Sequence, residues 1–232
     1  MRAFFLPSVI PKTGTALRMS PILLAINSTQ QHNTFRTMKT TNISLLSYAL
    51  LGLIHQRPCS GYDLRKTFSE TAMGSFSNSP GAIYPALERL EKRGWIVSKV
   101  EERAGLRRRR VYRLTDSGDR ELKQWLSQAV TRDEIIRGLG ELMLRFAFME
   151  HALGAEAAMS FLQKLRVQLG EYVPGLKQYL KLHGPEMPLS GMLALDSGVR
   201  NYETLQQWVE HAIQTYEQAL AEKPLPYRKS KH

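Results

Sequence analysis

The segment 43–54 constrains the fold most, because it has a helical pattern with apolar residues on every side. These residues recur at intervals of three and four and also fill most of the positions between: Ile43, Leu45, Leu46, Ala49, Leu50, Leu51, Leu53 and Ile54. A helix of this kind has no side that suits water, so other elements must surround it. We expect Asn42 to cap its first turn and Pro58 to end it.

Two further helices follow this segment. Ser60 and Gly61 open a short helix, and Ser79 with Pro80 opens a longer one. A capping side chain followed by proline is a strong helix start, because the missing N–H of proline costs nothing at the first helical position. Gly94 ends the longer helix.

A β-hairpin and a fourth helix complete this part of the chain. Residues 95–100 and 109–114 have the pattern of two paired strands, and the link between them leads into the arginine run 107–110. Thr115 supplies a capping side chain for the next helix. The order of elements predicts a mainly α fold with a small two-stranded β wing, which is a winged helix-turn-helix domain.

The helix after Pro80 presents two different faces. Ile83, Leu87 and Leu90 form one inward stripe. The residues that point away are small, polar or cationic: Gly81, Tyr84, Pro85, Glu88, Arg89 and Lys92. Such a face is typical of a helix that enters the DNA major groove. The arginine run would then lie at the wing tip and contact phosphates or the minor groove; a solvated charge run is the alternative.

The net charge of +11 is unevenly distributed. Both tails contain basic residues and no acidic ones, residues 41–126 have a basic excess, and residues 127–222 have an acidic excess. We divide the chain into a flexible N-terminal extension (1–40), a winged DNA-binding domain (41–130), a helical dimerisation domain (131–222) and a basic tail (223–232). The extension reads as a dispensable or upstream-start segment, with a cleaved targeting segment as the alternative.

The back of the chain is helical, and its last helix, about 191–221, has the most regular pattern. Apolar residues there alternate at four and three, which is typical of a seam between partner helices. The residues that we expect to form a dimer interface are Leu195, Val199, Tyr202, Val209, Ile213, Tyr216 and Leu220. An ordinary bundle within one chain is the alternative.

The cysteine and histidine content and the motifs of the sequence argue against several protein classes. The single Cys59 and six histidines without paired spacing predict neither a disulfide scaffold nor a metal site. Motifs of hydrolases, phosphate-binding loops, dinucleotide-binding folds and zinc peptidases are missing, so we expect no enzyme, no catalytic residues and no cofactor. No stretch approaches the ~20 apolar residues of a membrane span, so we expect a cytoplasmic protein without a membrane partner.

Five short motifs follow one another between residues 50 and 118. They are Leu50-Leu51-Gly52-Leu53-Ile54, Gly61-Tyr62-Asp63-Leu64, Gly81-Ala82-Ile83-Tyr84-Pro85-Ala86-Leu87-Glu88-Arg89-Leu90, Gly94-Trp95-Ile96 and Val111-Tyr112-Arg113-Leu114-Thr115 with Gly118. Over about residues 43–126 the chain resembles the PadR family of bacterial transcriptional regulators. It departs from the family at Ser60, where histidine is frequent, and at Asp63, where glutamate is common.

The resemblance implies a homodimer that binds operator DNA, usually as a repressor, and whose DNA affinity can fall when a small-molecule effector binds. Gly81 and Tyr84 match the family's recognition-helix motif. Our candidate DNA-contacting residues are Lys66, Ser79, Gly81, Tyr84, Arg89, Lys92, Arg107, Arg108, Arg109 and Arg110. We expect Tyr62 to be a core plug. The alternative function is a helical effector-sensing or protein-interaction adaptor without specific DNA binding.

Overall fold

The structure is a computed structural model, and it describes residues 43–75, 79–101 and 108–221. The predicted extension 1–40 and basic tail 223–232 lie outside these ranges. The elements in chain order are α2 (Leu45–Gln56), β1 (Cys59–Ser60), α3 (Gly61–Glu70), the 3-10 turn η1 (Ala72–Ser75), α4 (Pro80–Lys92), β2 (Ile96–Glu101), β3 (Arg109–Leu114), α5 (Asp116–Leu126), α6 (Arg132–Arg137), α7 (Leu139–Leu153), α8 (Ala155–His183), η2 (Gly184–Glu186) and α9 (Leu189–Ala221).

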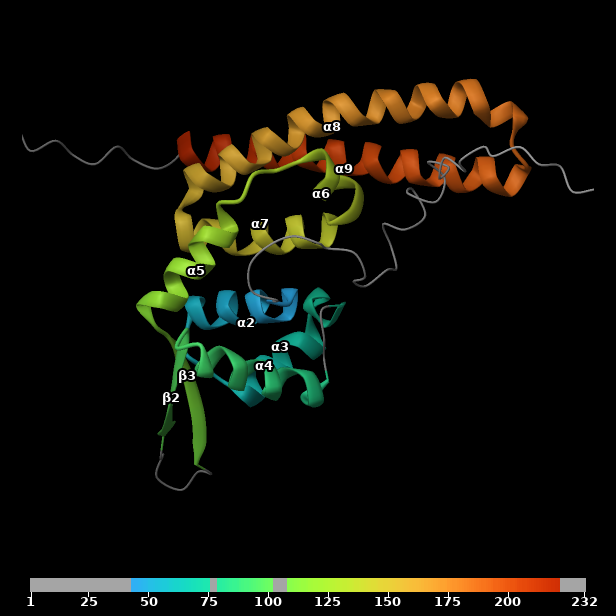
Figure 1. Cartoon of the computed structure of the whole chain (residues 1–232). Coiled ribbons are helices and arrows are strands. Elements are labelled where there is room, and N and C mark those ends of the chain that lie inside the picture. The colour runs from blue at the N-terminus through green and yellow to red at the C-terminus, as the bar shows by residue number, and fades with distance from the viewer. Residues whose placement is uncertain (1–42, 76–78, 102–107, 222–232) are drawn as a thin grey trace, which may run out of the picture.

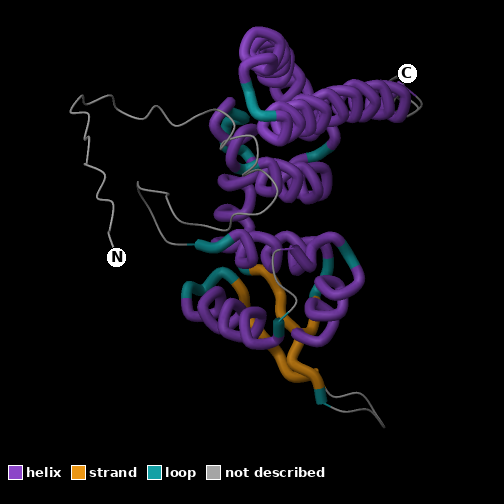
Figure 2. Tube along the Cα trace, turned by 90° about the vertical axis from the view of Figure 1, so that its right-hand side faces the viewer, coloured by secondary structure: helices purple, strands orange, loops and turns teal. Residues whose placement is uncertain are grey.

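The elements are arranged in two parts joined through the middle of the molecule. Figure 1 shows α2, α3, α4 and the β2–β3 hairpin at one end, α8 and α9 side by side at the other, and α7 between them. The turned view in Figure 2 also places the strands at the end opposite the long helices. The winged helix-turn-helix fold with a helical C-terminal part is therefore confirmed.

The sheet has three strands among the described residues, and not the expected two. β1 pairs antiparallel with β3, with Cys59 opposite Tyr112, and the strand order is β1-β3-β2. β1 contains only two residues. A segment this short cannot show the alternation of apolar and polar residues that reveals a strand in sequence. The extra strand fixes the start of α3 against the wing.

Helix α2 is buried as its sequence requires. Ala49, Leu50 and Leu51 have no exposed surface. The helix packs on α4, α5 and β3 on one side and on α7 on the other. At Gly52 an added Cβ would lie 2.5 Å from the ring of Phe148 on α7, so only glycine lets these helices approach so closely. The C-terminal helices therefore rest directly on the first helix of the winged part.

The helix boundaries agree with the sequence expectations except at the N-terminal end of α2. Ser44 caps α2, and its hydroxyl accepts the N–H of Ser47 at 3.3 Å. The predicted cap Asn42 lies outside the described residues. Ser60 caps α3 as expected, and Gly94, with a φ of 70°, follows the end of α4 in a conformation that glycine adopts without strain.

The predicted seam of α9 packs inside the single chain. Five of its seven residues are buried there: Leu195, Val199, Tyr202, Val209 and Ile213. The ring of Tyr202 meets Tyr172 of α8 edge-on at 5.0 Å, and its hydroxyl donates to the carbonyl of Ile135 at 3.3 Å. Own-chain packing therefore accounts for this stripe without a second copy, as the bundle alternative expected. Dimerisation through these residues stays a prediction.

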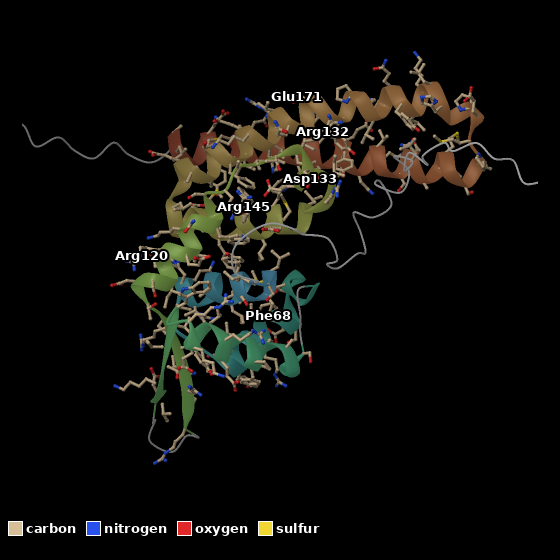
Figure 3. All side chains as sticks on the ribbon, viewed as in Figure 1. Phe68, Arg120, Arg132, Asp133, Arg145 and Glu171 are labelled. Atoms are coloured by element: carbon tan, nitrogen blue, oxygen red, sulfur yellow. The ribbon has the colours of Figure 1, made fainter. Side chains whose placement is uncertain are left out.

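One buried charge connects the two parts. Arg145 on α7 has no exposed side-chain surface. Its guanidinium donates to the carbonyl of Leu126 at the end of α5 and to those of Gln128 and Ala129 in the link that follows. It also donates to the carboxylate of Glu134 at 3.1 Å. The guanidinium carbon of Arg145 also lies 5.5 Å from the ring centre of Phe161 on α8. Figure 3 shows Arg145 in the middle of the molecule. The link between α5 and α6 is therefore held by one side chain.

A histidine pair lies where α2, α5 and α7 meet. His55 Nε2 is 3.2 Å from Asp119, and its ring meets that of His151 edge-on at 5.0 Å. Burial lowers the pKa of His55 from its usual value, and the charges of His151 and Lys123 act in the same direction, while Asp119 opposes them. Protonation of His55 is therefore less favourable in the folded chain than in the unfolded one.

Replacing Arg145 by methionine should lower the free energy of unfolding by about 2–4 kcal/mol, because it leaves the carbonyls and Glu134 without their buried donor. Urea denaturation of the full chain measures this. The matched control is Arg137→Met, whose side chain is 63% exposed and pairs with Asp133. A loss for Arg145→Met no larger than that of the control would contradict this role.

The free energy of unfolding should fall as the pH decreases from about 7.5 to 5.5, because His55 binds its proton more readily in the unfolded chain. His55→Gln should make this pH dependence measurably shallower, because it removes the group whose protonation favours the unfolded chain. Denaturation at both pH values checks it, with exposed His211→Gln as the control. An unchanged pH profile in His55→Gln would refute the effect.

Candidate nucleic-acid interface

The outer face of α4 is exposed at the end of the molecule farthest from α8 and α9 (Figures 1 and 2). Ile83 and Leu87 are fully buried, and Leu90 is 1% exposed, as the predicted inward stripe requires. The outward residues Tyr84 and Lys92 are exposed, and so are Gly81, Pro85 and Glu88. The structure therefore brings Gly81, Tyr84 and Lys92 onto one accessible face.

A second tyrosine extends this face, contrary to expectation. Tyr62, in the first turn of α3, is 61% exposed, so the prediction of a core plug is wrong. Leu64 and Phe68 fill the core from this helix, and a residue two positions before Leu64 points away from them. The Arg65 guanidinium lies 5.6 Å from the centre of the Tyr62 ring. The helical spacing around Leu64 could have revealed this exposure.

The first residue of α3 lies against the Tyr84 ring of α4. An added Cβ on Gly61 would be 2.6 Å from Cε1 of Tyr84, so the absence of a side chain on Gly61 makes room for the Tyr84 ring. Tyr84 keeps 44% of its surface exposed. The Tyr62 ring of α3 and the Tyr84 ring of α4 are thus both exposed near the place where the two helices meet.

Arg110 connects the wing to α4. Its Nη2 donates to Glu91 Oε2 at 2.7 Å, and its Nε donates to Ser98 Oγ at 2.6 Å. Ser98 Oγ in turn donates to Glu91 Oε1 at 2.6 Å. The hydrogen bond from Ser98 and the positive charge of Arg110 hold the pKa of Glu91 below its usual value. Arg110 is therefore engaged within the chain, although half of its side chain stays exposed.

Arg109 connects the wing to α3. Its Nη1 lies 3.7 Å from Asp63 Oδ2, the oxygen that also accepts the N–H of Ser60 at 2.9 Å and its hydroxyl at 2.8 Å. Partial burial acts to raise the pKa of Asp63, but the hydrogen bonds from Ser60 and the charges of Arg109 and Arg57 outweigh it and lower that pKa. Ser60 and Asp63, the two departures from the family pattern, thus form one capping box.

The remaining predicted residues do not gather on one face. Lys66 is exposed on α3, where its Nζ lies 3.9 Å from Glu70. Ser79 occupies the cap position of α4 and Arg108 precedes β3, and both are exposed. Arg107 lies outside the described residues.

Arg89 lies on the flank of α4 away from the wing, where it lines an open hollow with Arg93 and two serines of α2. Arg89 therefore lies apart from the wing arginines Arg109 and Arg110.

The chemistry of this surface is that of binding. Among the described residues, no group of three or more His, Cys, Asp and Glu side chains could hold a metal ion. Within the same ranges no helix is long and apolar enough to cross a membrane. Cys59 is buried, and burial raises the pKa of its thiol. The exposed face of α4 with Tyr84, the exposed Tyr62 of α3 and the basic wing can donate hydrogen bonds to an extended anionic partner.

The Glu91–Arg110 pair should show a coupling free energy of about 0.5 kcal/mol in a double-mutant cycle with Glu91→Gln and Arg110→Gln. Thermal or urea unfolding measures it. The matched control pair is Glu101 and Arg113, which lie 3.3 Å apart with similar exposure. Their coupling should be smaller, because no serine bridge is recorded between them. Equal couplings would show that the serine bridge adds nothing.

Residues 50–124 match the family model described as the transcriptional regulator PadR-like family. The Negative transcriptional regulator PadR of Bacillus subtilis is 30% identical to this chain over 146 residues, which cover 63% of this chain and 79% of that protein. The Probable transcriptional regulator Rv1176c of Mycobacterium tuberculosis is 26% identical over 93 residues, which cover 40% of this chain and 49% of that protein.

Among solved structures, the crystal structure of Bacillus subtilis PadR in complex with operator DNA is similar, with 26% identity and a TM-score of 0.36. The match covers 74% of this chain and 99% of that chain. The family match spans the winged part, and the identity to the Bacillus regulator extends over most of that protein. This chain therefore belongs to the PadR-like family of transcriptional regulators.

Proposed function

We propose that this regulator binds operator DNA as a homodimer in the cytoplasm and represses its target genes until a small-molecule effector lowers its DNA affinity. The observation that carries the DNA-binding part is the exposed outer face of α4 beside the wing. The name of the Bacillus relative, a negative regulator, supports repression. The small-molecule effector is inferred from the family resemblance.

The geometry of α4 supports insertion into the major groove. A helix about 10–12 Å across fits a groove about 12 Å wide. Gly81 has no side chain to keep the helix start away from DNA, and the Tyr84 hydroxyl can donate a hydrogen bond to a phosphate. Lys92 adds a positive charge about two turns further along the same face. Tyr62 and Arg65 extend the same surface from α3.

The homodimer is proposed through residues 131–222, with residues 41–130 as the DNA-binding part. Two copies related by a two-fold axis would present two winged ends to two half-sites. The seam predicted on α9 is packed inside the chain, but other apolar surface stays accessible on these helices. Leu189 and Leu193, near the turn between α8 and α9, are 69% and 53% exposed. These residues are available to a second copy.

The function is tested by fluorescence anisotropy of the full chain with duplex DNA from upstream of its own gene, against scrambled competitor. Binding should resist the competitor and weaken steeply between ~50 and ~200 mM salt, because phosphate contacts release counterions. Equal binding to both duplexes would disprove specificity for that site. An absence of binding even at low salt would overturn the DNA-binding function in favour of an adaptor that binds protein or effector.

Tyr84→Phe should weaken binding to the specific duplex roughly tenfold, which corresponds to about 1.4 kcal/mol, because it removes the proposed hydrogen bond to a phosphate. The same anisotropy assay measures this. Tyr179→Phe, on α8, is the matched control and should bind as the unmodified chain does. Equal affinities for the two variants would remove Tyr84 from the interface.

A further inference from the structure

An open hollow lies on the flank of α4 that faces away from the wing. It is lined by Ser44 and Ser47 at the start of α2 and by Arg89, Leu90 and Arg93 near the end of α4. The two serine hydroxyls are 3.1 Å apart, and both arginines are exposed. The hollow therefore combines two cationic side chains with two hydroxyls.

The flank is defined by helical spacing. Glu91 contacts the wing through Ser98 and Arg110. With about 3.6 residues per turn, Arg89 and Arg93 lie on roughly the opposite side of the helix from Glu91. The wing and the hollow thus border the exposed face of α4 from its two sides.

The positive charge of the hollow is not neutralised within the described part of the chain. Recorded ion pairs engage Arg109 and Arg110 on the wing side, whereas none joins Arg89 or Arg93 to a carboxylate of the described residues. The Arg93 guanidinium lies 5.2 Å from the centre of the Trp95 ring, which leaves its N–H edge for other donations. The first turn of α2 contains no acidic residue. This chemistry fits an anion.

We propose that the hollow binds a backbone phosphate of DNA, an inference that rests on the proposed DNA-binding function. When a helix lies in the major groove, a sugar-phosphate strand runs along each of its flanks, because the groove is barely wider than the helix. On the wing side Arg109 and Arg110 are already paired with Asp63 and Glu91. On the other side Arg89, Arg93 and the one serine hydroxyl whose proton is not used between Ser44 and Ser47 can donate directly to phosphate oxygens.

A contact of this kind positions the protein without reading bases. Its loss should weaken binding to specific and scrambled duplex equally, because both present the same phosphates. The hollow would then hold α4 across the groove, while Tyr84 and the wing act on the other side.

The test uses Arg89→Gln and Arg93→Gln in the full chain, with Arg120→Gln as the matched control. Arg120 is exposed on α5, away from α4 (Figure 3). Affinity for each duplex is measured from ~50 to ~200 mM salt. Each hollow variant should reduce the slope of log affinity against log salt by about one unit, and the control should leave it unchanged. Arg89→Lys, which keeps the charge, should retain the original slope.

The outcomes separate this site from the function on which it rests. If the unmodified chain binds DNA and both hollow variants keep the slope of the control, the phosphate site is wrong and the DNA-binding function stands. If the unmodified chain binds no DNA, both fall.

Thermal unfolding in inorganic phosphate, against chloride at equal ionic strength, distinguishes a site for free phosphate. A phosphate-specific rise in Tm that both hollow variants abolish, together with unchanged DNA slopes, would overturn the assignment to DNA.

Discussion

The structure depends on the burial of α2 from all sides. A helix without a polar face cannot lie on the surface, so the winged elements cover one side and α7 covers the other. The close approach at Gly52 and Phe148 lets the two parts share one hydrophobic core. A movement of the C-terminal helices would therefore displace α2, on which α4 packs. Arg145 of α7 also fixes the link that joins α5 to α6.

The surface proposed to meet DNA is not simply basic. Asp63 and Glu91 lie beside it and pair with two of the wing arginines. These carboxylates reduce the local positive charge, but they also fix the hairpin against α3 and α4. The conformational entropy of these arginine side chains is therefore partly lost on folding, before DNA binds. The flank with Arg89 and Arg93 has the opposite character, with charge left for a partner.

The sequence predicted most of the winged part because its signals are local. Caps at Ser60 and Thr115, the glycine after α4 and the spacing of Ile83, Leu87 and Leu90 each act within a few residues. Contacts between distant residues could not be predicted: Asp63 with Arg109 and Glu91 with Arg110 are joined only by the fold. The stripe on α9 shows a further limit, because periodicity reveals that a face is buried but not whether its partner belongs to the same chain.

Oxidative footprinting of the full chain, with and without its specific duplex, tests the central claim most directly. Tyr62 and Tyr84 are exposed in the free chain on the proposed interface, and Trp208 is exposed at the other end of the molecule. The account predicts that DNA protects both tyrosines from oxidation and leaves Trp208 unchanged. Protection of Trp208 with the tyrosines still reactive would place DNA on the C-terminal helices and contradict the account.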